Sequence, residues 1–302
     1  MSRFDRRVRL TPLLLLSVLL SGGCSRKASE PVIGVTLVTK EHVFYNELEQ
    51  GMRGEAQKQG FRLVVTSGDW DLARQQNQIK DFITRRVSAI VVCPVNSSGV
   101  GPAIAEARQA GIPVFTADIR ALNAPVVSHI ASDNREGGGM AGRFMGQLLA
   151  GRKEAKIAII HQPVTETALE RVAGFQKAIA AFANVKVVAA PNGDGVRDRA
   201  MRAAEDVLQA FPDLAGFFGI NDDSALGAMA AIESSGRKGL VVVGFDATPE
   251  ARDAIRRGTA LKGDIAQQPG EIGRKTVQTV AAHLRGEPVP ATVPIPVQLI
   301  DR

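Results

Sequence analysis

Residues 32–93 read VIGVTLVTKEHVFYNELEQGMRGEAQKQGFRLVVTSGDWDLARQQNQIKDFITRRVSAIVVC, and their pattern predicts the fold class. Its β-rich runs alternate with runs of helical periodicity, in the order strand 32–38, helix about 45–59, strand 62–66, helix about 71–86 and strand 89–93. The last run is continuously apolar, as expected of a strand that helices cover on both faces. Such alternation predicts parallel sheets joined by right-handed crossovers.

The same alternation continues through the rest of the chain. Further strands are expected near 114–117, 126–130, 156–160, 185–190, 216–219, 240–245 and 261–266, mostly with helices between them. Aromatic residues make up only 5% of the 302 residues, which suits closely packed α/β layers better than an all-β sandwich. The length accommodates two such sheets, so we predict an α/β protein with two parallel sheets.

The first 24 residues have the character of a bacterial export signal. Four arginines precede the apolar run 13–20, which is too short to span a bilayer comfortably, and Ser21-Gly-Gly-Cys24 follows. The small residues before Cys24 resemble a lipobox, although Ser21 stands where leucine is usual. We predict a signal peptide over 1–23, acylation of Cys24 and a polar tether over 24–31, with secretion without a lipid as the alternative.

The predicted leader carries much of the positive charge. The whole chain has a formal charge of +6, and residues 1–23 contribute four Arg and one Asp, or +3, which leaves +3 for the remainder. No Lys/Arg-rich run remains after the leader, so we expect no nucleic-acid partner. If Cys24 is acylated, Cys93 has no disulfide partner, and its place after an apolar run predicts a small buried residue.

Four motifs point to a known family. They are Val126-Val-Ser-His-Ile-Ala-Ser-Asp-Asn134 with Gly137 and Gly138, Asn221-Asp222 with Ala225-Leu-Gly-Ala228, Val243-Gly-Phe-Asp-Ala-Thr-Pro249, and Ile265-Ala-Gln267 with Ile272-Gly273. In their order and spacing they resemble the type I periplasmic sugar-binding proteins of bacterial ABC importers, of the ribose-binding kind. The resemblance covers roughly residues 32–302.

This resemblance implies the type I periplasmic-binding-protein fold, in which two Rossmann-like lobes are joined by a three-segment hinge. The crossovers fall near Asp133, Gln267 and Pro296. The expected lobes are therefore discontinuous in sequence, with 32–133 plus 268–296 forming the N-terminal lobe and 134–267 plus 297–302 forming the C-terminal lobe.

Residue by residue, the resemblance also implies a ligand-binding set. Its members are His42, Phe44, Tyr45, Asp118, Arg171, Asn221, Phe245, Asp246 and Gln267. Most of them follow a predicted strand, and open parallel sheets bind ligands beyond the carboxyl ends of their strands. Their chemistry suits a sugar, whose hydroxyls donate and accept hydrogen bonds while its C–H faces pack on rings. His42 remains open as a contact or a loop residue, and Tyr45 as a contact or a core residue.

Several positions depart from the ribose-binding pattern. Ile119 stands where an arginine is expected and Gly195 where an aromatic ring would stack, while Val38 and His42 replace a serine and an asparagine. Losing a bidentate donor and a stacking face weakens the case for ribose itself. Arg120 and Trp70 are the candidates to fill the vacated space.

The function implied by the resemblance is capture of a sugar or sugar-like polyol outside the cytoplasm and its delivery to an ABC importer permease. We expect a monomer in the periplasm or cell envelope, lipid-anchored through Cys24, with no cofactor, no metal and no catalytic residue. The alternative is a sensing module that docks on a chemoreceptor or a histidine kinase.

A repressor would need a helix-turn-helix where the export signal lies. The run Gly137-Gly-Gly-Met-Ala-Gly142 matches a nucleotide-binding pattern, but we interpret it as close helix packing.

Overall fold

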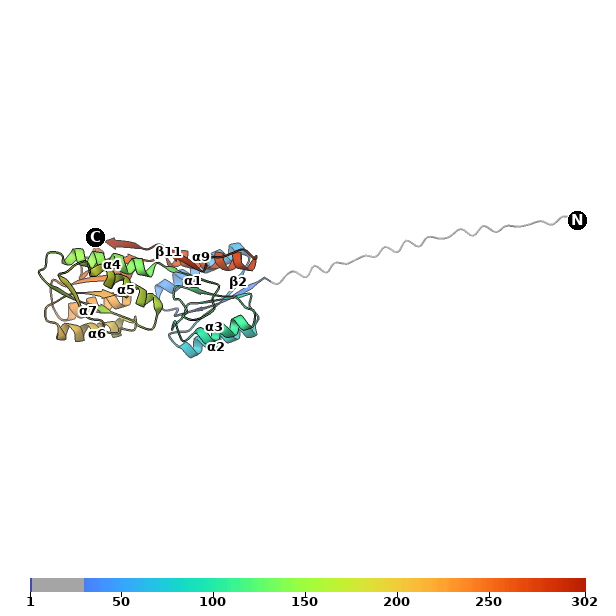
Figure 1. Cartoon of the computed structure of the whole chain (residues 1–302), viewed down its shortest axis with the longest axis horizontal. Coiled ribbons are helices and arrows are strands. Elements are labelled where there is room, and N and C mark those ends of the chain that lie inside the picture. Colours follow the sequence, from blue (N-terminus) through green and yellow to red (C-terminus); the bar gives the residue numbers. More distant parts are fainter. Residues whose placement is uncertain (2–29) are drawn as a thin grey trace.

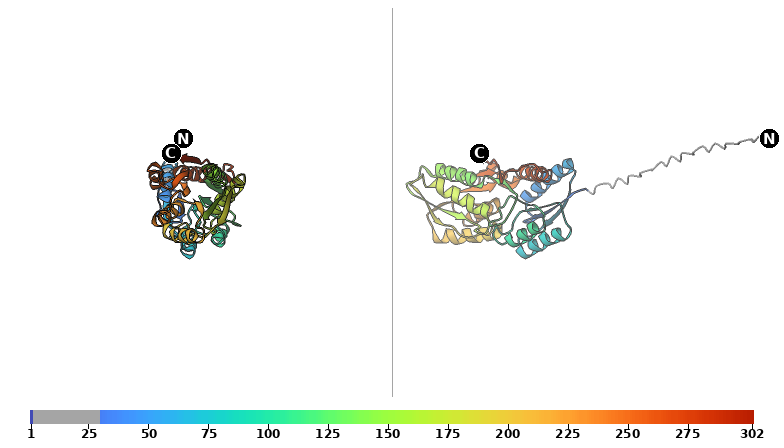
Figure 2. Two further views of the ribbon diagram at one scale, coloured as in Figure 1. Left: turned by 90° about the vertical axis from the view of Figure 1, so that its left-hand side faces the viewer. Right: turned by 45° about the vertical axis from the view of Figure 1, so that its right-hand side comes forward.

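The computed structural model describes residue 1 and residues 30–302 of the chain. The predicted signal peptide after residue 1, the predicted acylation site Cys24 and most of the predicted tether lie outside the described residues. The described chain forms two six-stranded sheets with helices on both faces of each. Figures 1 and 2 show the two halves lying end to end along the long axis of the molecule. None of the helices in the described part is long and apolar enough to cross a membrane.

The first sheet has the strand order β11-β5-β4-β3-β1-β2, and all of its strands run parallel. Its members are β1 (Val32–Leu37), β2 (Arg62–Ser67), β3 (Ala89–Val92), β4 (Val114–Ala117), β5 (Ser128–Ser132) and β11 (Thr292–Ile295). Helices α1 (Val43–Gln59) and α9 (Pro269–Leu284) cover one face, and α2 (Leu72–Thr84) and α3 (Gly101–Gln109) cover the other (Figure 1). Each face has its own hydrophobic core, which includes Met52 and Val277 on the first side and Phe82 and Ile104 on the second.

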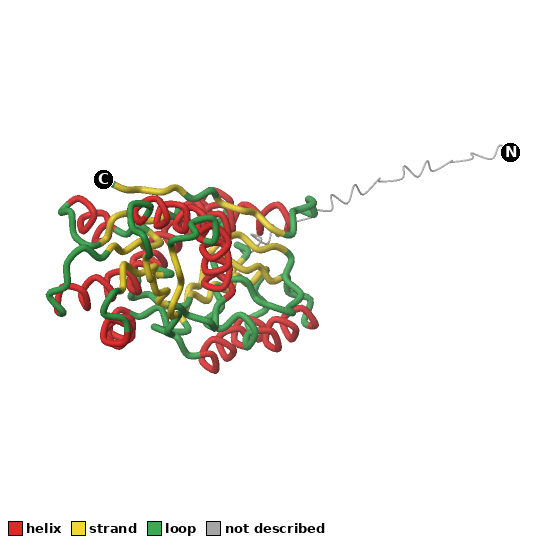
Figure 3. Tube along the Cα trace, turned by 60° about the vertical axis from the view of Figure 1, so that its left-hand side comes forward, coloured by secondary structure: helices red, strands yellow, loops and turns green. Residues whose placement is uncertain are grey.

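The second sheet has the order β12-β10-β9-β8-β6-β7, and only β12 runs antiparallel to its neighbour. Its members are β6 (Ala155–Ile160), β7 (Val185–Ala189), β8 (Leu214–Gly219), β9 (Val241–Asp246), β10 (Leu261–Ala266) and β12 (Gln298–Asp301). One core lies under α4 (Asn134–Leu149) and α5 (Glu166–Ile179). The other lies under α6 (Arg197–Ala210), α7 (Asp222–Ser234) and α8 (Pro249–Arg256). In both halves, the strands are enclosed between helices (Figure 3).

The predicted alternation is confirmed, and most strand ends agree within two residues. β5 begins at Ser128 and not at 126, because Val126 N donates to Ala124 O in a tight turn. Strands β11 and β12 were not predicted. Both are four residues long and lie at the edge of their sheet, and β11 contains Pro294. An edge strand tolerates proline because it needs no donor on its open side, so the pattern that identifies central strands is missing there.

The glycine-rich run of α4 allows it to lie directly against α5. A Cβ at Gly138 would lie 2.0 Å from the carbonyl oxygen of Arg171, and one at Gly142 would lie 2.6 Å from that of Phe175. These two glycines are four residues apart and therefore share one face of the helix. The run is thus occupied by helix packing, as the sequence interpretation held. This packing also fixes the helix that carries Arg171.

The chain passes between the two sheets three times. It leaves the first sheet after Ser132, returns to it after Ala266 and leaves it again after Ile295. The loops after the strands of both sheets meet at the junction of the two halves, and together they line a cavity there. The carboxyl ends of two parallel sheets therefore face one cavity, which is where open α/β sheets place ligands.

Candidate ligand-binding site

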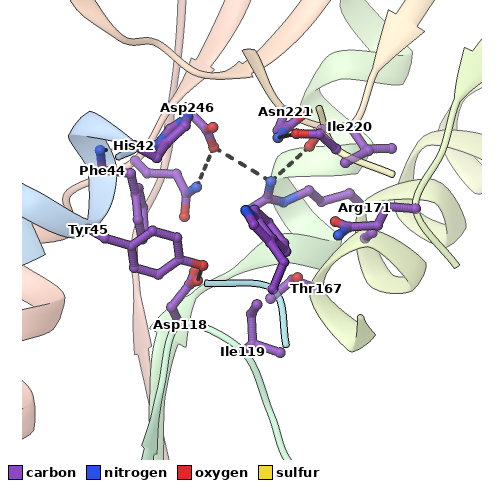
Figure 4. Close-up of a pocket in the computed structure, with 15 residues that line it drawn as sticks. His42, Phe44, Tyr45, Asp118, Ile119, Thr167, Arg171, Ile220, Asn221 and Asp246 are labelled. Carbon is purple, nitrogen blue, oxygen red and sulfur yellow. Dashed lines mark hydrogen bonds and ion pairs between the residues drawn. The ribbon is translucent and has the colours of Figure 1, made fainter. Parts of the chain in front are cut away.

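A cavity of about 60 Å³ lies between the two sheets. Because one water molecule needs about 10–15 Å³ of such space, the cavity has room for a small solute. The first half lines it with His42, Phe44, Tyr45, Trp70, Asp118 and Ile119, and the second half with Gln162, Thr167, Ala168, Arg171, Gly195, Ile220, Asn221, Asp246 and Gln267. Figure 4 shows these side chains converging from both halves.

The structure brings eight of the nine sequence-predicted residues to this cavity. The exception is Phe245, whose side chain is fully buried in the core under α4. Neighbouring residues of a strand point to opposite faces of the sheet, and a Cβ at Gly137 of α4 would lie 2.7 Å from the Phe245 ring. Phe245 was expected to contact the ligand directly, but its ring lies in the core and supports the guanidinium of Arg171.

Arg171 is held in place from several sides. Its Nε donates to Asn134 Oδ1 at 2.8 Å, and its Nη1 donates to the carbonyl oxygen of Ile220 at 2.8 Å. Nη1 also lies 3.6 Å from Asp246 Oδ1, and the guanidinium carbon lies 3.8 Å from the centre of the Phe245 ring. Contacts from four residues leave a buried guanidinium with one orientation, and its Nη2 has no hydrogen bond to the described residues.

Asp118 is a buried carboxyl that pairs with a phenol. It follows β4 with a φ of 64°, and its Oδ2 accepts a hydrogen bond of 2.9 Å from Tyr45 Oη. Burial raises the pKa of Asp118 to about 6, although Arg171 and the Tyr45 hydrogen bond act in the opposite direction. Tyr45 is thus a buried core residue that also lines the cavity and donates to its acid, and a contact with the ligand stays a prediction.

Asp246 sits in a strained turn at the end of β9. Its φ is 121° and that of Ala247 is 56°. Two buried acids hold this turn, since Ala247 N donates to Asp264 Oδ1 at 3.1 Å and Thr248 N donates to Asp222 Oδ2 at 2.6 Å. Burial raises the pKa of Asp222 to about 6 and the pKa of Asp264 well above its usual value. The acid pair therefore retains a proton where exposed carboxyls are ionised.

Gln267 extends the acceptor side of the cavity. Its Nε2 donates to Asp246 Oδ1 at 2.6 Å. Its Oε1 is buried and has no hydrogen-bond partner among the described residues. A buried acceptor without a partner costs roughly 1–3 kcal/mol, which a bound donor would recover. The cavity thus offers an unused acceptor beside a buried carboxylate.

His42 and Asn221 combine a capping role with a place in the cavity wall. His42 Nδ1 accepts from Phe44 N at 3.2 Å at the start of α1, and its Nε2 lies 4.0 Å from Asp223 Oδ2 of the second half. Asn221 Oδ1 accepts from Ser224 N at 3.0 Å at the start of α7, and its Nδ2 donates to Gly195 O at 3.1 Å. Both side chains therefore cap a helix and also line the cavity.

Four further cavity residues were missed by the sequence reasoning: Gln162, Thr167, Ala168 and Ile220. Gln162 and Ile220 follow β6 and β8, so the strand-end rule could have found them. Thr167 and Ala168 lie in the first turn of α5, one helical turn before Arg171. Their face of the helix could have been inferred from Arg171, because residues three and four apart share a face.

The two halves also touch beside the cavity. Ser97 N donates to Val164 O at 3.3 Å, and Ser97 Oγ accepts from Glu166 N at 3.0 Å. Arg120 Nε lies 3.5 Å from Glu166 Oε2. The candidate Arg120 thus lies at the rim in an ion pair, whereas Trp70 lines the cavity. These contacts hold the two halves together beside the cavity, so the cleft between them is closed.

The cavity has no cluster of metal ligands. No group of three or more His, Cys, Asp or Glu side chains suited to a metal ion occurs within residues 30–302. Cys93, which directly follows β3, is fully buried in the hydrophobic core. The side chains that line the cavity offer a solute hydrogen-bonding groups, two carboxyls, one guanidinium and aromatic surface.

Comparison with known proteins agrees with this geometry. The family model described as "Periplasmic binding protein domain" matches residues 33–288. The chain is 36% identical to the ribose import binding protein of Escherichia coli, over 95% of this chain and 96% of that protein.

Two solved structures are also similar. An ABC transporter solute-binding protein from Mycobacterium smegmatis with bound glycerol has a TM-score of 0.85 and 35% identity, covering 90% of this chain and 94% of that one. A solute-binding protein from Bacillus halodurans with bound myo-inositol has a TM-score of 0.83 and 26% identity, with the same coverage. The chain therefore belongs to the periplasmic binding protein family.

Proposed function

We propose that this protein captures a sugar or sugar-like polyol outside the cytoplasm and delivers it to the permease of an ABC importer. The relative from Escherichia coli is named for ribose import, and the two similar structures hold glycerol and myo-inositol. All three solutes are polyhydroxylated and uncharged. The cavity of this chain offers the acceptors, donors and rings that such solutes need.

The unpartnered Gln267 Oε1 is the observation that carries this proposal. It lines a closed cavity together with the carboxyls of Asp118 and Asp246, so acceptors are in excess. A solute rich in O–H donors satisfies such a set, while Arg171 Nη2 donates to its oxygens. An anionic solute would meet two buried carboxyls and is disfavoured.

The solute need not be ribose. Ile119 lines the cavity with a buried apolar side chain, and Gly195 offers only backbone. A ligand with an apolar edge on the Ile119 side fits this wall better than one with hydroxyls all round, because an unpaired hydroxyl there would lose its hydrogen bonds to water.

We propose that binding selects the closed arrangement through a hinge at the three crossovers. The lobes in this proposal are residues 32–133 plus 268–296 and residues 134–267 plus 297–302. The distribution of strands between the sheets supports this division. Closure excludes water and lets polar groups of both lobes satisfy one solute, so the ligand favours the closed state by its extra contacts there.

A thermal-shift panel tests the function. Pentoses, hexoses, deoxy sugars and polyols are added to the purified protein, with amino acids as the control panel. A solute at 100 times its dissociation constant stabilises the folded state by about 2.7 kcal/mol, so at least one sugar or polyol should raise the unfolding midpoint clearly. Stabilisation by amino acids alone would refute the assignment.

The proposed anchor and location rest on the leader sequence. We propose a monomer in the periplasm or cell envelope, acylated at Cys24. Changing Cys24→Ser should release the protein from the membrane fraction into the soluble fraction of cell extracts. Continued membrane retention of the variant would contradict acylation.

A further inference from the structure

Trp70 is a large apolar side chain that the binding chemistry described so far does not use. It is the single tryptophan of the chain, and it lies in the loop between β2 and α2. Its side chain lines the inner cavity and also an outer hollow of about 460 Å³ that opens toward solvent. Trp70 thus lies between the inner cavity and the outer hollow.

Trp70 is 45% exposed. An isolated exposed apolar residue is ordinary on a protein surface. Trp70 differs because it borders a cavity that also contains a buried guanidinium and two buried carboxyls. A ring that is half in water beside such groups gains contacts when a solute with C–H surface covers it.

The backbone at this position is strained. Asp69 and Trp70 have φ values of 48° and 64°, a conformation that bulky residues rarely adopt. Surrounding contacts enforce it: Trp70 N donates to Val38 O at 3.3 Å, and Arg74 Nη1 lies 2.8 Å from Asp69 Oδ2. Ser67 Oγ also donates to Asp69. Strain that the surroundings over-determine is typical of ligand-binding positions.

The opposite half offers no side chain at the corresponding place. Gly195 lines the same cavity and the same outer hollow as Trp70. Its φ is 67°, and a Cβ there would lie 3.0 Å from Gln162 Oε1, so a side chain at this position would be strained as well as crowded. At this place, therefore, the second half presents backbone, and Trp70 of the first half presents the aromatic surface.

We propose that Trp70 is a specificity-determining ligand contact whose indole packs on the C–H face of the sugar and closes the cavity beside Gly195. This inference rests on the proposed function and extends it to the kind of solute. A ring-shaped sugar or cyclic polyol presents a continuous C–H face to an indole, whereas a short acyclic polyol does not. Trp70 therefore favours cyclic solutes over acyclic ones.

The chain itself provides the probe. Because Trp70 is the only tryptophan, indole emission and its quenching by acrylamide report on this position alone. Each cyclic sugar or cyclic polyol that stabilises the protein in the thermal-shift panel should shift the emission and reduce the quenching. A cyclic solute that stabilises the protein but changes neither signal would overturn the proposal and leave the proposed function intact. A panel in which nothing stabilises the protein would overturn both.

Variants test the contact energetically, with affinities measured by calorimetry. Trp70→Ala should weaken binding of a cyclic solute about tenfold or more, while Trp70→Phe, which keeps a ring, should stay within about threefold of the parent. Leu148→Ala is the matched control, since Leu148 is 38% exposed on α4 and does not line the cavity. Parent-like affinity of Trp70→Ala would refute the contact. An equal loss for cyclic and acyclic polyols would refute the role in specificity.

Discussion

The two walls of the cavity differ in chemistry. The first half contributes three aromatic rings and Ile119 beside His42 and the single carboxyl of Asp118. The second half contributes six polar side chains, namely Gln162, Thr167, Arg171, Asn221, Asp246 and Gln267. One wall thus offers surface to the C–H groups of a solute and the other offers partners to its hydroxyls. The polar wall should therefore carry the largest single contributions to affinity.

The polar wall is tested most severely by Arg171→Ala. Affinity should fall about 100-fold or more, because the variant loses a charged donor and leaves the Asp246 carboxylate without its partner at 3.6 Å. The free energy of unfolding should also fall, by about 3–5 kcal/mol, since one member of a buried ion pair is removed. Calorimetric titration and urea unfolding measure the two effects.

Arg143→Ala is the control for that experiment, because Arg143 is half exposed in an ion pair on α4. It should change neither quantity by more than about 1 kcal/mol. Parent-like binding by Arg171→Ala would show that the polar wall does not hold the solute.

The one acid of the aromatic wall gives a pH-dependent prediction through Asp118→Asn. Burial raises the pKa of Asp118 from 3.8 to about 6 in the folded protein. Because the folded state holds this proton more tightly than the unfolded state does, the contribution of Asp118 to the free energy of unfolding is fully present below about pH 3.8. It is lost as the pH rises through about 6. The variant cannot ionise, so at pH 7 it should be more stable than the parent by up to about 3 kcal/mol, with little difference near pH 4.

Urea unfolding of both proteins at several pH values measures this effect. Asp222, whose pKa is also raised to about 6, is present in both proteins, so its contribution to the pH dependence cancels in the comparison. The stabilised variant should bind its solute more weakly, since it loses a charged acceptor. A stability difference that does not depend on pH would contradict the assignment.

Tyr45→Phe separates the ring of Tyr45 from its hydroxyl. The ring remains, but Asp118 loses the 2.9 Å hydrogen bond that lowers its pKa. Stability should fall by about 1–2 kcal/mol at pH 7, and the pKa of Asp118 should rise further. The pH dependence of unfolding measures both effects, and a variant identical to the parent would show that the hydroxyl contributes nothing.

The smallest effect is expected at the rim. Arg120→Ala removes the ion pair in which Arg120 Nε lies 3.5 Å from Glu166 Oε2. The side chain of Arg120 is 32% exposed and that of Glu166 is 18% exposed. Such pairs contribute about 1 kcal/mol or less, so affinity should change by about fivefold at most. A loss as large as that of Arg171→Ala would mean that closure, and not the cavity walls, dominates binding.

The fold was largely predictable because central strands carry a strong local pattern. The run Ala89–Val92 is entirely buried and entirely apolar, and such runs mark the core of both sheets. The pattern fails at the edges, where β11 contains Pro294 and β12 is half-buried. Edge strands depend on pairing with a distant strand, which no local pattern records.

The site was predictable where residues follow strands and less so elsewhere. Asp118, Asn221 and Asp246 could be placed by the strand-end rule and by family motifs. Thr167 reaches the cavity from a helix of the second half, which depends on how the two halves meet. Phe245 shows the converse, because a shift of one residue along a strand turns a side chain from the cavity to the core.

The central claim is that one solute is held between both walls. A crystal structure of the protein with the best sugar or polyol of the thermal-shift panel tests it most directly. We predict that the solute lies between the two sheets, with hydroxyls on Asp246, Gln267 and Arg171 and a C–H face on an aromatic ring of the first half. A solute bound to one lobe alone, or at another surface, would contradict the account.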